Sequence, residues 1–442
     1  MLMPTIPGSF IALLDGFRSC FTAPTFTTFT ALCAGLLTQP GPGTVTGMLA
    51  GARLAGIWHH TRAHRFFTSA RWWPDHLGLL LADLIVGRLL QANQPILLAV
   101  DDTLFHRASR RLPLAAFHHD PTAPAGRRIG WGHCWVVVAI LVRLPFVPHR
   151  HLALPVLARL WHPRDTATGH TKLVLAHQMI RLVAARYPDR RLDVVADAAY
   201  AGHSPLGLPG RVTLTSRLRR DAALHALPAA RQPGQRGRPR RKGDRLPTLE
   251  RLADLPATTF KQVTVRRYGK RATVHLAAIT CLWYHVHRAR PVQVVLVREQ
   301  GRTAGFDLAL VSTDLDATPA ELVERYSARW AIEVTFLESK HLVGVGQARN
   351  RRRRAIQRTV PFGLVCYSLL VCWYALNGHA ADDVAARRAL APWYRHKRTP
   401  STLDMLVAFR RAMLAEYHRT HPGQPTDAKL TDALLTWDVT AA

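Results

Sequence analysis

The chain has 442 residues, 48% of them hydrophobic, which excludes a generally disordered protein and allows two or three domains with sizeable cores. Lysine and arginine total 59 against 29 acids, so the formal net charge is +30. This excess suits a phosphate backbone or an anionic membrane. The plain alternatives are solubility or a genome that favours arginine, but that genome bias does not explain the scarcity of acids.

Three features bear on location. The six cysteines are scattered without a zinc-binding spacing, so we expect reduced thiols in a cytoplasmic protein. Residues 1–14 lack the positive start and the small-residue cleavage site of a signal peptide. The longest apolar run, Phe362–Leu376, is short for a bilayer and includes polar side chains, so we expect a buried helix and no membrane association.

Residues 1–92 have helical periodicity, interrupted by glycine and proline at positions 39–43 and by Pro74. The segment His59–Trp73 mixes basic and aromatic side chains. Two interpretations stay open for it: contact with DNA, or an aromatic stripe packed into a core. We expect a helical N-terminal region that binds DNA.

Residues 93–215 alternate apolar runs with a helical stretch. Ile96–Val100 and Leu192–Ala196 are predicted buried strands, and each is followed at once by acid, Asp101-Asp102 and Asp197 respectively. Further elements are expected in two ranges: a strand over Trp135–Val142 and a helix over Lys172–Tyr187. Strands alternating with helices predict the α/β fold class with a mixed sheet.

Residues 216–315 begin with a basic, Pro/Gly-rich stretch, Arg231–Arg245, which is a solvated loop or a segment that lies along DNA. Four strand-like runs come next, at Gln262–Tyr268, Thr273–Leu282, Val292–Val297 and Leu308–Ser312. Residues 316–355 contain one predicted helix and end in the basic cluster Arg349–Arg354, and residues 356–442 are predicted helical.

The predicted helix begins with a capping box, Thr318-Pro319-Ala320-Glu321. The helical period places Tyr326, Arg329, Glu333 and Lys340 on one face, while Ile332, Phe336 and Leu337 lie off that face and are expected to pack on a core. One carboxylate flanked by a phenol, a guanidinium and an ammonium is typical of a site that holds a phosphate beside a metal-binding acid. A solvated helix with ordinary ion pairs is the plain alternative.

The spacing Tyr-two-Arg-three-Glu-six-Lys resembles the signature of the IS-four-like group of DDE transposases, the enzymes of bacterial insertion sequences. Val100-Asp101-Asp102-Thr103 and Val195–Tyr200 resemble the two motifs that carry the other acids, and Gly344–Asn350 resembles the stretch after the glutamate in related transposases. The likeness extends from about Leu97 to Asn350. It implies an RNase H-like core over residues 93–215 and 316–355, with a β-rich insertion between them.

This resemblance implies Asp101, Asp197 and Glu333 as catalytic metal ligands for two Mg²⁺ or Mn²⁺ ions. Asp101 is favoured over Asp102 as the first ligand, and Asp102 is left to support it or to cap a turn. The residues expected to bind DNA phosphates are Tyr326, Arg329, Lys340, Arg349, Arg351 and Arg352.

The implied activity is cleavage at the ends of a mobile element and joining of the 3′-hydroxyls to target DNA. The expected partners are the terminal inverted repeats, target DNA and a second copy of the chain. Two alternatives stay open: an RNase H-like nuclease without strand transfer, and a domesticated DNA-binding protein that does not cut.

Overall fold

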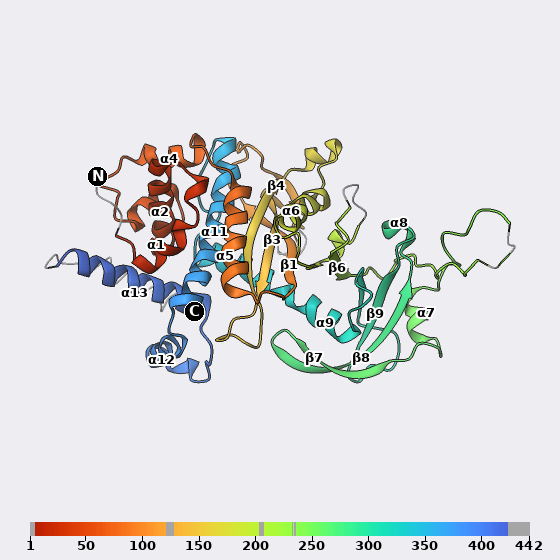
Figure 1. The fold of residues 1–442 in the computed structure, drawn as a ribbon. Coiled ribbons are helices and arrows are strands. Elements are labelled where there is room, and N and C mark those ends of the chain that lie inside the picture. The colour runs from red at the N-terminus through yellow and green to blue at the C-terminus, as the bar shows by residue number, and fades with distance from the viewer. Residues whose placement is uncertain (1–4, 121–127, 203–206, 232, 234–235, 423–442) are drawn as a thin grey trace. The chain divides into compact units, whose positions relative to one another are not determined.

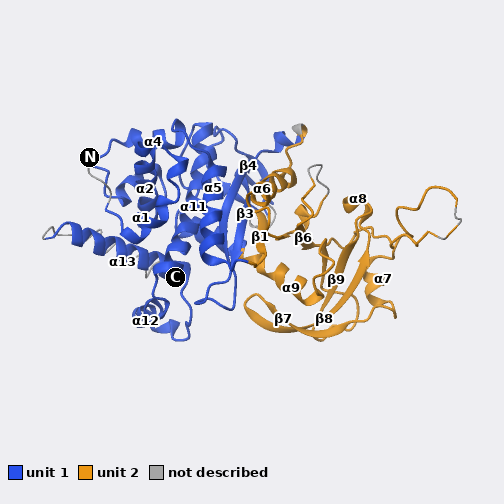
Figure 2. Cartoon of the chain, viewed as in Figure 1, with its two compact units in different colours: residues 1–92, 102–166, 332–442 blue, residues 93–101, 167–331 orange. Residues whose placement is uncertain are grey.

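The computed structural model of the chain describes residues 5–120, 128–202, 207–231, 233 and 236–422. The chain forms two compact units (Figure 2): unit 1 comprises residues 1–92, 102–166 and 332–442, and unit 2 comprises residues 93–101 and 167–331. The border crosses strand β1 (Ile96–His106) between its two adjacent acids, Asp101 and Asp102.

Most helices of unit 1 come from the two ends of the chain (Figure 1). Those before residue 92 are α1 (Gly8–Asp15), α2 (Ala23–Thr38), α3 (Val45–Gly51), α4 (His60–Thr68) and α5 (Pro74–Leu89). Those after residue 329 are α10 (Trp330–His341), α11 (Arg353–Asn377), α12 (Ala380–Leu390) and α13 (Thr402–Thr420).

The aromatic residues of the segment 59–73 are mostly core. The rings of Phe66 and Phe67 lie 5.8 and 5.3 Å from that of Phe362 on α11, and Trp72 stacks on Phe66 at 5.0 Å. Arg358, also on α11, donates to the carbonyl of Ala70 at 2.9 Å, so the packing of α4 against α11 includes a buried guanidinium. Burial of these rings contributes to stability in proportion to the apolar area removed from water.

Helix α11 is the one helix, among those the structure describes, with the length and apolar composition to cross a membrane. In the span that passes this test, 89% of the residues are buried inside the protein. Ser368 in its middle donates to the carbonyl of Pro155 on β4, at 2.9 Å. These contacts are those of a core helix, as the sequence predicts for Phe362–Leu376.

The strands of unit 1 are β2 (Ala116–His119), β3 (Ile129–Val142), β4 (Leu152–Trp161) and the second half of β1. β3 pairs antiparallel with both β2 and β4. His133 on β3 is fixed in a neutral form by two neighbours: its Nδ1 accepts from Arg107 Nε at 3.1 Å, so Nε2 carries the proton and donates to the Pro113 carbonyl at 2.9 Å. Burial, reinforced by the charge of Arg107, lowers the pKa of His133 to about 4.

Unit 2 contains a mixed sheet in the order β1-β5-β6-β10-β9-β8-β7. The first part of β1, β5 (Leu192–Ala196) and β6 (Val212–Arg217) run parallel, and the rest pair antiparallel. The remaining strands are β7 (Lys261–Arg267), β8 (Lys270–Cys281), β9 (Val292–Glu299) and β10 (Leu308–Ser312). With helix α6 (Lys172–Arg186) between β1 and β5 along the chain, this arrangement confirms the α/β class predicted from the sequence.

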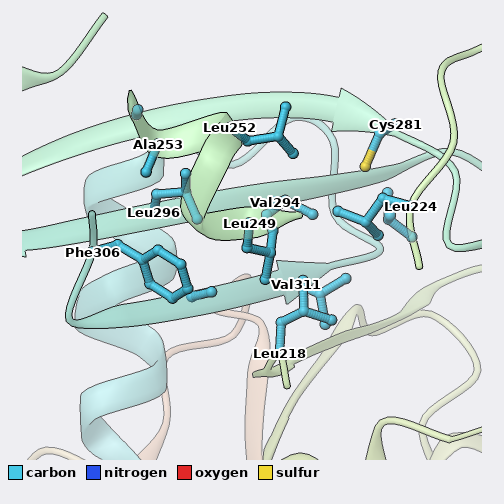
Figure 3. Packing of buried hydrophobic residues seen from close by; sticks show 13 residues of the cluster. Leu218, Leu224, Leu249, Leu252, Ala253, Cys281, Val294, Leu296, Phe306 and Val311 are labelled. Carbon is cyan, nitrogen blue, oxygen red and sulfur yellow. The ribbon is translucent and has the colours of Figure 1, made fainter. Parts of the chain in front are cut away.

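Helices cover both faces of the antiparallel part of this sheet. On one face, Val294, Leu296 and Val311 pack with Leu249 and Leu252 of α7 (Leu249–Asp254), as Figure 3 shows. On the other face, the alternate residues of the same strands pack with Leu322, Val323 and Tyr326 of α9 (Pro319–Ala328). Because successive strand residues point to opposite faces, β9 and β10 contribute to both cores. The second core fixes α9, and Arg329 directly follows the last residue of α9.

Several predictions about elements need correction. The strand expected over Ile96–Val100 continues through both acids to His106. The helix expected to run unbroken to Lys340 is divided at Arg329, with α9 before and α10 after, although its capping box is present as predicted. Leu337 is 60% exposed and does not join the core, whereas Ile332 and Phe336 are buried. Residues 423–442, expected to be helical, lie outside the described range.

Candidate active site

Asp101 and Asp197 come directly after residues that are paired across two neighbouring parallel strands. In unit 2, β1 and β5 are in register from Ile96 opposite Leu192 to Val100 opposite Ala196. Neighbouring strands lie about 4.8 Å apart, so the residues that follow, Asp101 within β1 and Asp197 just after β5, bring their carboxylates together at the carboxyl end of β5. The apolar runs that predict buried strands therefore also set the position of the two acids, as is usual for sites at the carboxyl ends of parallel strands.

Asp197 is held by local backbone geometry. Its Oδ1 accepts from the backbone N–H of Ala199 at 2.8 Å, at the start of a short 3₁₀ helix over Ala198–Tyr200. Its own carbonyl accepts from the hydroxyl of Ser216 on β6, at 2.8 Å. This cap orients the half-buried carboxylate and gives a reason for the Asp-Ala-Ala-Tyr sequence after β5.

Arg329 lies directly on Asp101. Its Nη1 donates to Asp101 Oδ2 at 2.7 Å, and the two side chains are only 13% and 16% exposed. Such a charge-assisted bond in a partly desolvated position is stronger than a surface ion pair. From the sequence we expect Arg329 to bind a DNA phosphate. In the structure of unit 2, its guanidinium instead neutralises the carboxylate of the first acid of the predicted site.

Tyr326 lies one turn before Arg329, on α9. Its ring centroid is 5.7 Å from the Arg329 guanidinium carbon, and its side chain is buried in the core beneath α9. Burial raises the pKa of Tyr326, with the charge of Arg329 acting in the opposite direction. The tyrosine is thus a neutral phenol that supports Arg329 by packing, whatever else it contacts in a complex.

Asp102 has a different neighbour from Asp101. On β3 of unit 1, the Cys134 thiol donates to Asp102 Oδ2 at 3.4 Å. Adjacent residues on a strand point to opposite faces, so the two acids are not equivalent, as the sequence predicts. The idea that Asp102 caps a turn is wrong, because it lies inside β1, with four more strand residues after it.

Lys340 is anchored to the second half of β1 within unit 1. Its Nζ donates to Thr103 Oγ1 at 2.7 Å and to the Leu104 carbonyl at 2.9 Å, and it lies 4.8 Å from the Phe105 ring centroid. Burial lowers the pKa of Lys340, an effect that the nearby Asp120 carboxylate opposes. Sequence reasoning missed this role, although the Thr of the Asp-Asp-Thr triplet was a signal for it.

Glu333 and Glu338 lie on α10 and differ in their surroundings. Glu333 is half-buried in the first turn, where a negative charge is favoured by the helix dipole. Glu338 accepts from Tyr367 Oη at 2.7 Å and from Thr402 Oγ1 at 2.8 Å. These bonds, together with Thr335 donating to the Ala153 carbonyl at 2.9 Å, fix the helix that carries Glu333 and Lys340 inside unit 1.

The segment after α10 needs two glycines. Gly344 and Gly346 have φ of +76° and +85°. A Cβ on Gly344 would lie 2.9 Å from the backbone nitrogen of Gly43, and one on Gly346 would lie 2.1 Å from the Phe105 ring. These contacts give a physical reason for the Gly-Val-Gly sequence at positions 344–346.

The basic cluster at residues 349–354 lies on the surface of unit 1. Arg349, Arg351 and Arg352 are exposed, the last two just before α11. Arg349 also lines a pocket of about 570 Å³ that lies between residues 39–42 and 341–344. Three exposed arginines, one of which lines this pocket, suit contact with an anionic partner.

A second charged network in unit 2 holds the start of β5 to α9. Asp314 accepts from Arg325 Nη1 on α9 at 2.8 Å and from Arg191, and Asp193 on β5 accepts from Arg191 Nε at 2.9 Å and from Thr213 Oγ1 at 2.7 Å. Burial alone would raise the pKa of Asp314, but the two arginines outweigh it and hold that pKa below its usual value. Sequence reasoning also missed this network, which fixes α9 and hence Arg329.

The chemistry of the two strand-end acids fits a divalent cation. Asp101 and Asp197 supply carboxylate oxygens, the hard ligands that Mg²⁺ and Mn²⁺ prefer. Unit 2 contains both of them, and unit 1 contains Glu333. Within the described ranges, no group of three or more His, Cys, Asp or Glu side chains is placed to hold a metal ion.

Comparison with known proteins identifies the family. A family model described as DDE superfamily endonuclease matches residues 16–272, more than half of the chain. The match includes Asp101, Asp102 and Asp197 and ends before Glu333. No curated protein matches this chain. The mixed α/β fold is consistent with the RNase H-like core of a DDE enzyme.

Proposed function

Because the chain belongs to the DDE superfamily endonucleases, enzymes that act on DNA, we propose that it is the transposase of a mobile element. It would cut phosphodiester bonds at the ends of its own element and join the 3′-hydroxyl ends to target DNA. The observation that carries this proposal is the pair of acids that follow the register-matched residues Val100 of β1 and Ala196 of β5, with Arg329 Nη1 2.7 Å from Asp101.

In this proposal Asp101, Asp197 and Glu333 hold two Mg²⁺ or Mn²⁺ ions, and Glu333 is assigned by the sequence motif. Bound in this way, the metal ions would activate the attacking water or 3′-hydroxyl and stabilise the leaving oxygen. Arg329 would balance the charge of the acids and orient the DNA strand next to them, as a planar guanidinium can do with a phosphate.

The other residues of the proposal bind and position DNA. Lys340 would set the second half of β1 through Thr103 and add a positive charge beside the reacting strand. Arg349, Arg351 and Arg352 would contact phosphates away from the chemistry, supported by their exposure and by the net charge of +30. The partners would be the terminal inverted repeats, target DNA and a second copy of the chain, in the cytoplasm, and the subgroup would be the IS-four-like one.

The test is a cleavage and joining assay with the short inverted repeats found beside the coding region. The full chain is incubated with labelled end DNA and a plasmid target in Mg²⁺, Mn²⁺, Ca²⁺ or chelator. We expect nicked ends and joined products in Mg²⁺ and Mn²⁺, and binding without efficient cutting in Ca²⁺, because Mg²⁺ requires a tighter octahedral geometry.

Each of the other outcomes of this assay would support a different mechanism or function. Cleavage without any joined product would indicate a nuclease that does not transfer strands. Tight binding to the ends with no cleavage in either metal would indicate a domesticated DNA-binding protein. Full cleavage in chelator would exclude the two-metal mechanism.

A further inference from the structure

The hairpin of β2 and β3 presents an aromatic face to solvent. Phe117 lies opposite Trp131 and His119 lies opposite Ile129, so these four side chains share one face of the hairpin. Phe117 is 58% exposed and Ile129 is 65% exposed. The rings of Phe117 and Trp131 are 5.0 Å apart, in an edge-to-face arrangement.

The opposite face of the hairpin supplies the packing that unit 1 needs. His118 is buried there against Trp161, with ring centroids 5.5 Å apart. The buried Asp120 carboxylate pairs with His106 Nε2 on β1, at 2.8 Å. The hairpin is therefore held to β1 and β4 by its inner face, and its outer aromatic face has no packing role in that core.

Arginine completes the outer face. The Arg110 guanidinium lies 4.8 Å from the Phe117 ring centroid and 5.2 Å from that of Trp131. Trp131 Nε1 donates to the Ser109 carbonyl at 3.0 Å, which fixes the indole plane. Between residues 103 and 135 the sequence contains five arginines and a single acid, the buried Asp120. An aromatic face with a guanidinium over it, in a stretch of sequence whose single acid is buried, is complementary to an anionic partner that has flat rings.

We propose that the outer face of this hairpin, formed by Arg110, Phe117, Ile129 and Trp131, binds unpaired bases of the DNA strand that the protein processes. This inference rests on the proposed function in that DNA is the ligand. Every base offers a ring face for stacking once it leaves the duplex, and the arginines can track the backbone. A paired duplex hides those faces between its base pairs, so the preference is for a frayed or single-stranded segment.

The test compares two DNA probes with the full chain: a blunt duplex, and the same duplex carrying an unpaired thymidine tail. The loss of one base–aromatic stack corresponds to roughly tenfold in affinity. We expect Phe117→Ala to weaken binding of the tailed duplex about tenfold and to leave binding of the blunt duplex unchanged. A tail containing 5-iodouracil should cross-link on illumination to residues 117 or 131, as mapped by mass spectrometry.

Two matched variants separate stacking from other roles. Phe117→Leu keeps an apolar side chain but removes the ring face, so it should behave like Phe117→Ala. Trp393→Ala removes another exposed aromatic of unit 1 and should bind both probes as the wild type does. Thermal unfolding by circular dichroism verifies that each variant is folded.

Three results would overturn the inference. The first is a wild-type affinity of Phe117→Ala for the tailed duplex. The second is wild-type binding by Phe117→Leu, which would make the face a general apolar contact. The third is a change in self-association of Phe117→Ala without a change in DNA binding, which would make it a contact between copies. Cleavage of blunt end DNA by the wild type would still support the proposed function in each case, so the two failures are distinguishable.

Discussion

Lys340 and Thr103 provide the sharpest test of how α10 is coupled to β1. The Lys340 ammonium donates to the Thr103 hydroxyl at 2.7 Å and to the Leu104 carbonyl at 2.9 Å. A hydrogen bond to a charged group contributes about 1.5–3 kcal/mol. Thr103→Val removes one acceptor and nearly conserves volume at a buried position, so it should lower the free energy of unfolding by about that amount.

The assay is a double-mutant cycle measured by urea unfolding. Thr103→Val, Lys340→Met and the double variant should show a coupling free energy of about 1–3 kcal/mol, because both single changes remove the same bond. Single-turnover cleavage at saturating end DNA is then measured for the same set. We expect both single variants to slow cleavage, since Thr103→Val removes one of the two bonds that position Lys340 and Lys340→Met removes the ammonium itself.

Additive effects on stability would refute this account of Lys340. A wild-type cleavage rate for Thr103→Val combined with a slow Lys340→Met would show that the ammonium acts on the DNA phosphate independently of β1. Slow cleavage in both variants together with measured coupling would confirm that the position of Lys340, set by Thr103, is what cleavage requires.

Three further predictions rest on individual side chains. Arg329→Ala should lower the single-turnover cleavage rate on the order of 100-fold at saturating DNA, because it leaves the Asp101 carboxylate without its guanidinium and misplaces the DNA strand. A wild-type rate with weaker binding would instead make Arg329 an ordinary contact to the DNA backbone. The pKa of His133 is lowered to about 4, so its neutral form stabilises the fold above its unfolded pKa near 6.5, and about 3 kcal/mol should be lost as pH falls from 6.5 to 4. A His133→Gln variant should lack that part of the pH dependence of urea unfolding. Replacing Arg351 and Arg352 by Gln should make the slope of log DNA affinity against log salt concentration shallower by about 2. An unchanged slope would show that neither side chain contacts a DNA phosphate.

The elements that were predictable from the sequence are those with a local signal. Leu192–Ala196 is a strand with the predicted bounds because its apolar residues, interrupted only by Asp193, are buried on both faces. The capping box at Thr318 is equally local, since donor and acceptor are three residues apart. The positions of Asp101 and Asp197 directly after Val100 and Ala196 follow from the same two runs.

The features that were missed depend on distant parts of the chain. β1 continues past Val100 although its acids break the apolar pattern, and such a pattern cannot show where a strand ends once polar residues enter it. Arg329 meets Asp101 across 228 positions of sequence, and Glu338 accepts hydrogen bonds from Tyr367 and Thr402 on two other helices. Leu337 looked apolar enough for a core, but helical spacing alone does not say which side of α10 is covered.

The central claim is that Asp101, Asp197 and Glu333 hold the metal ions with which the protein cuts DNA. The direct measurement is single-turnover cleavage of end DNA in Mg²⁺ by Asp101→Asn, Asp197→Asn and Glu333→Gln, with Asp189→Asn as an exposed control from the turn before β5. The account predicts no cleavage and retained end binding for the first three, and the wild-type rate for the control. Cleavage near the wild-type rate in any of the three would contradict it.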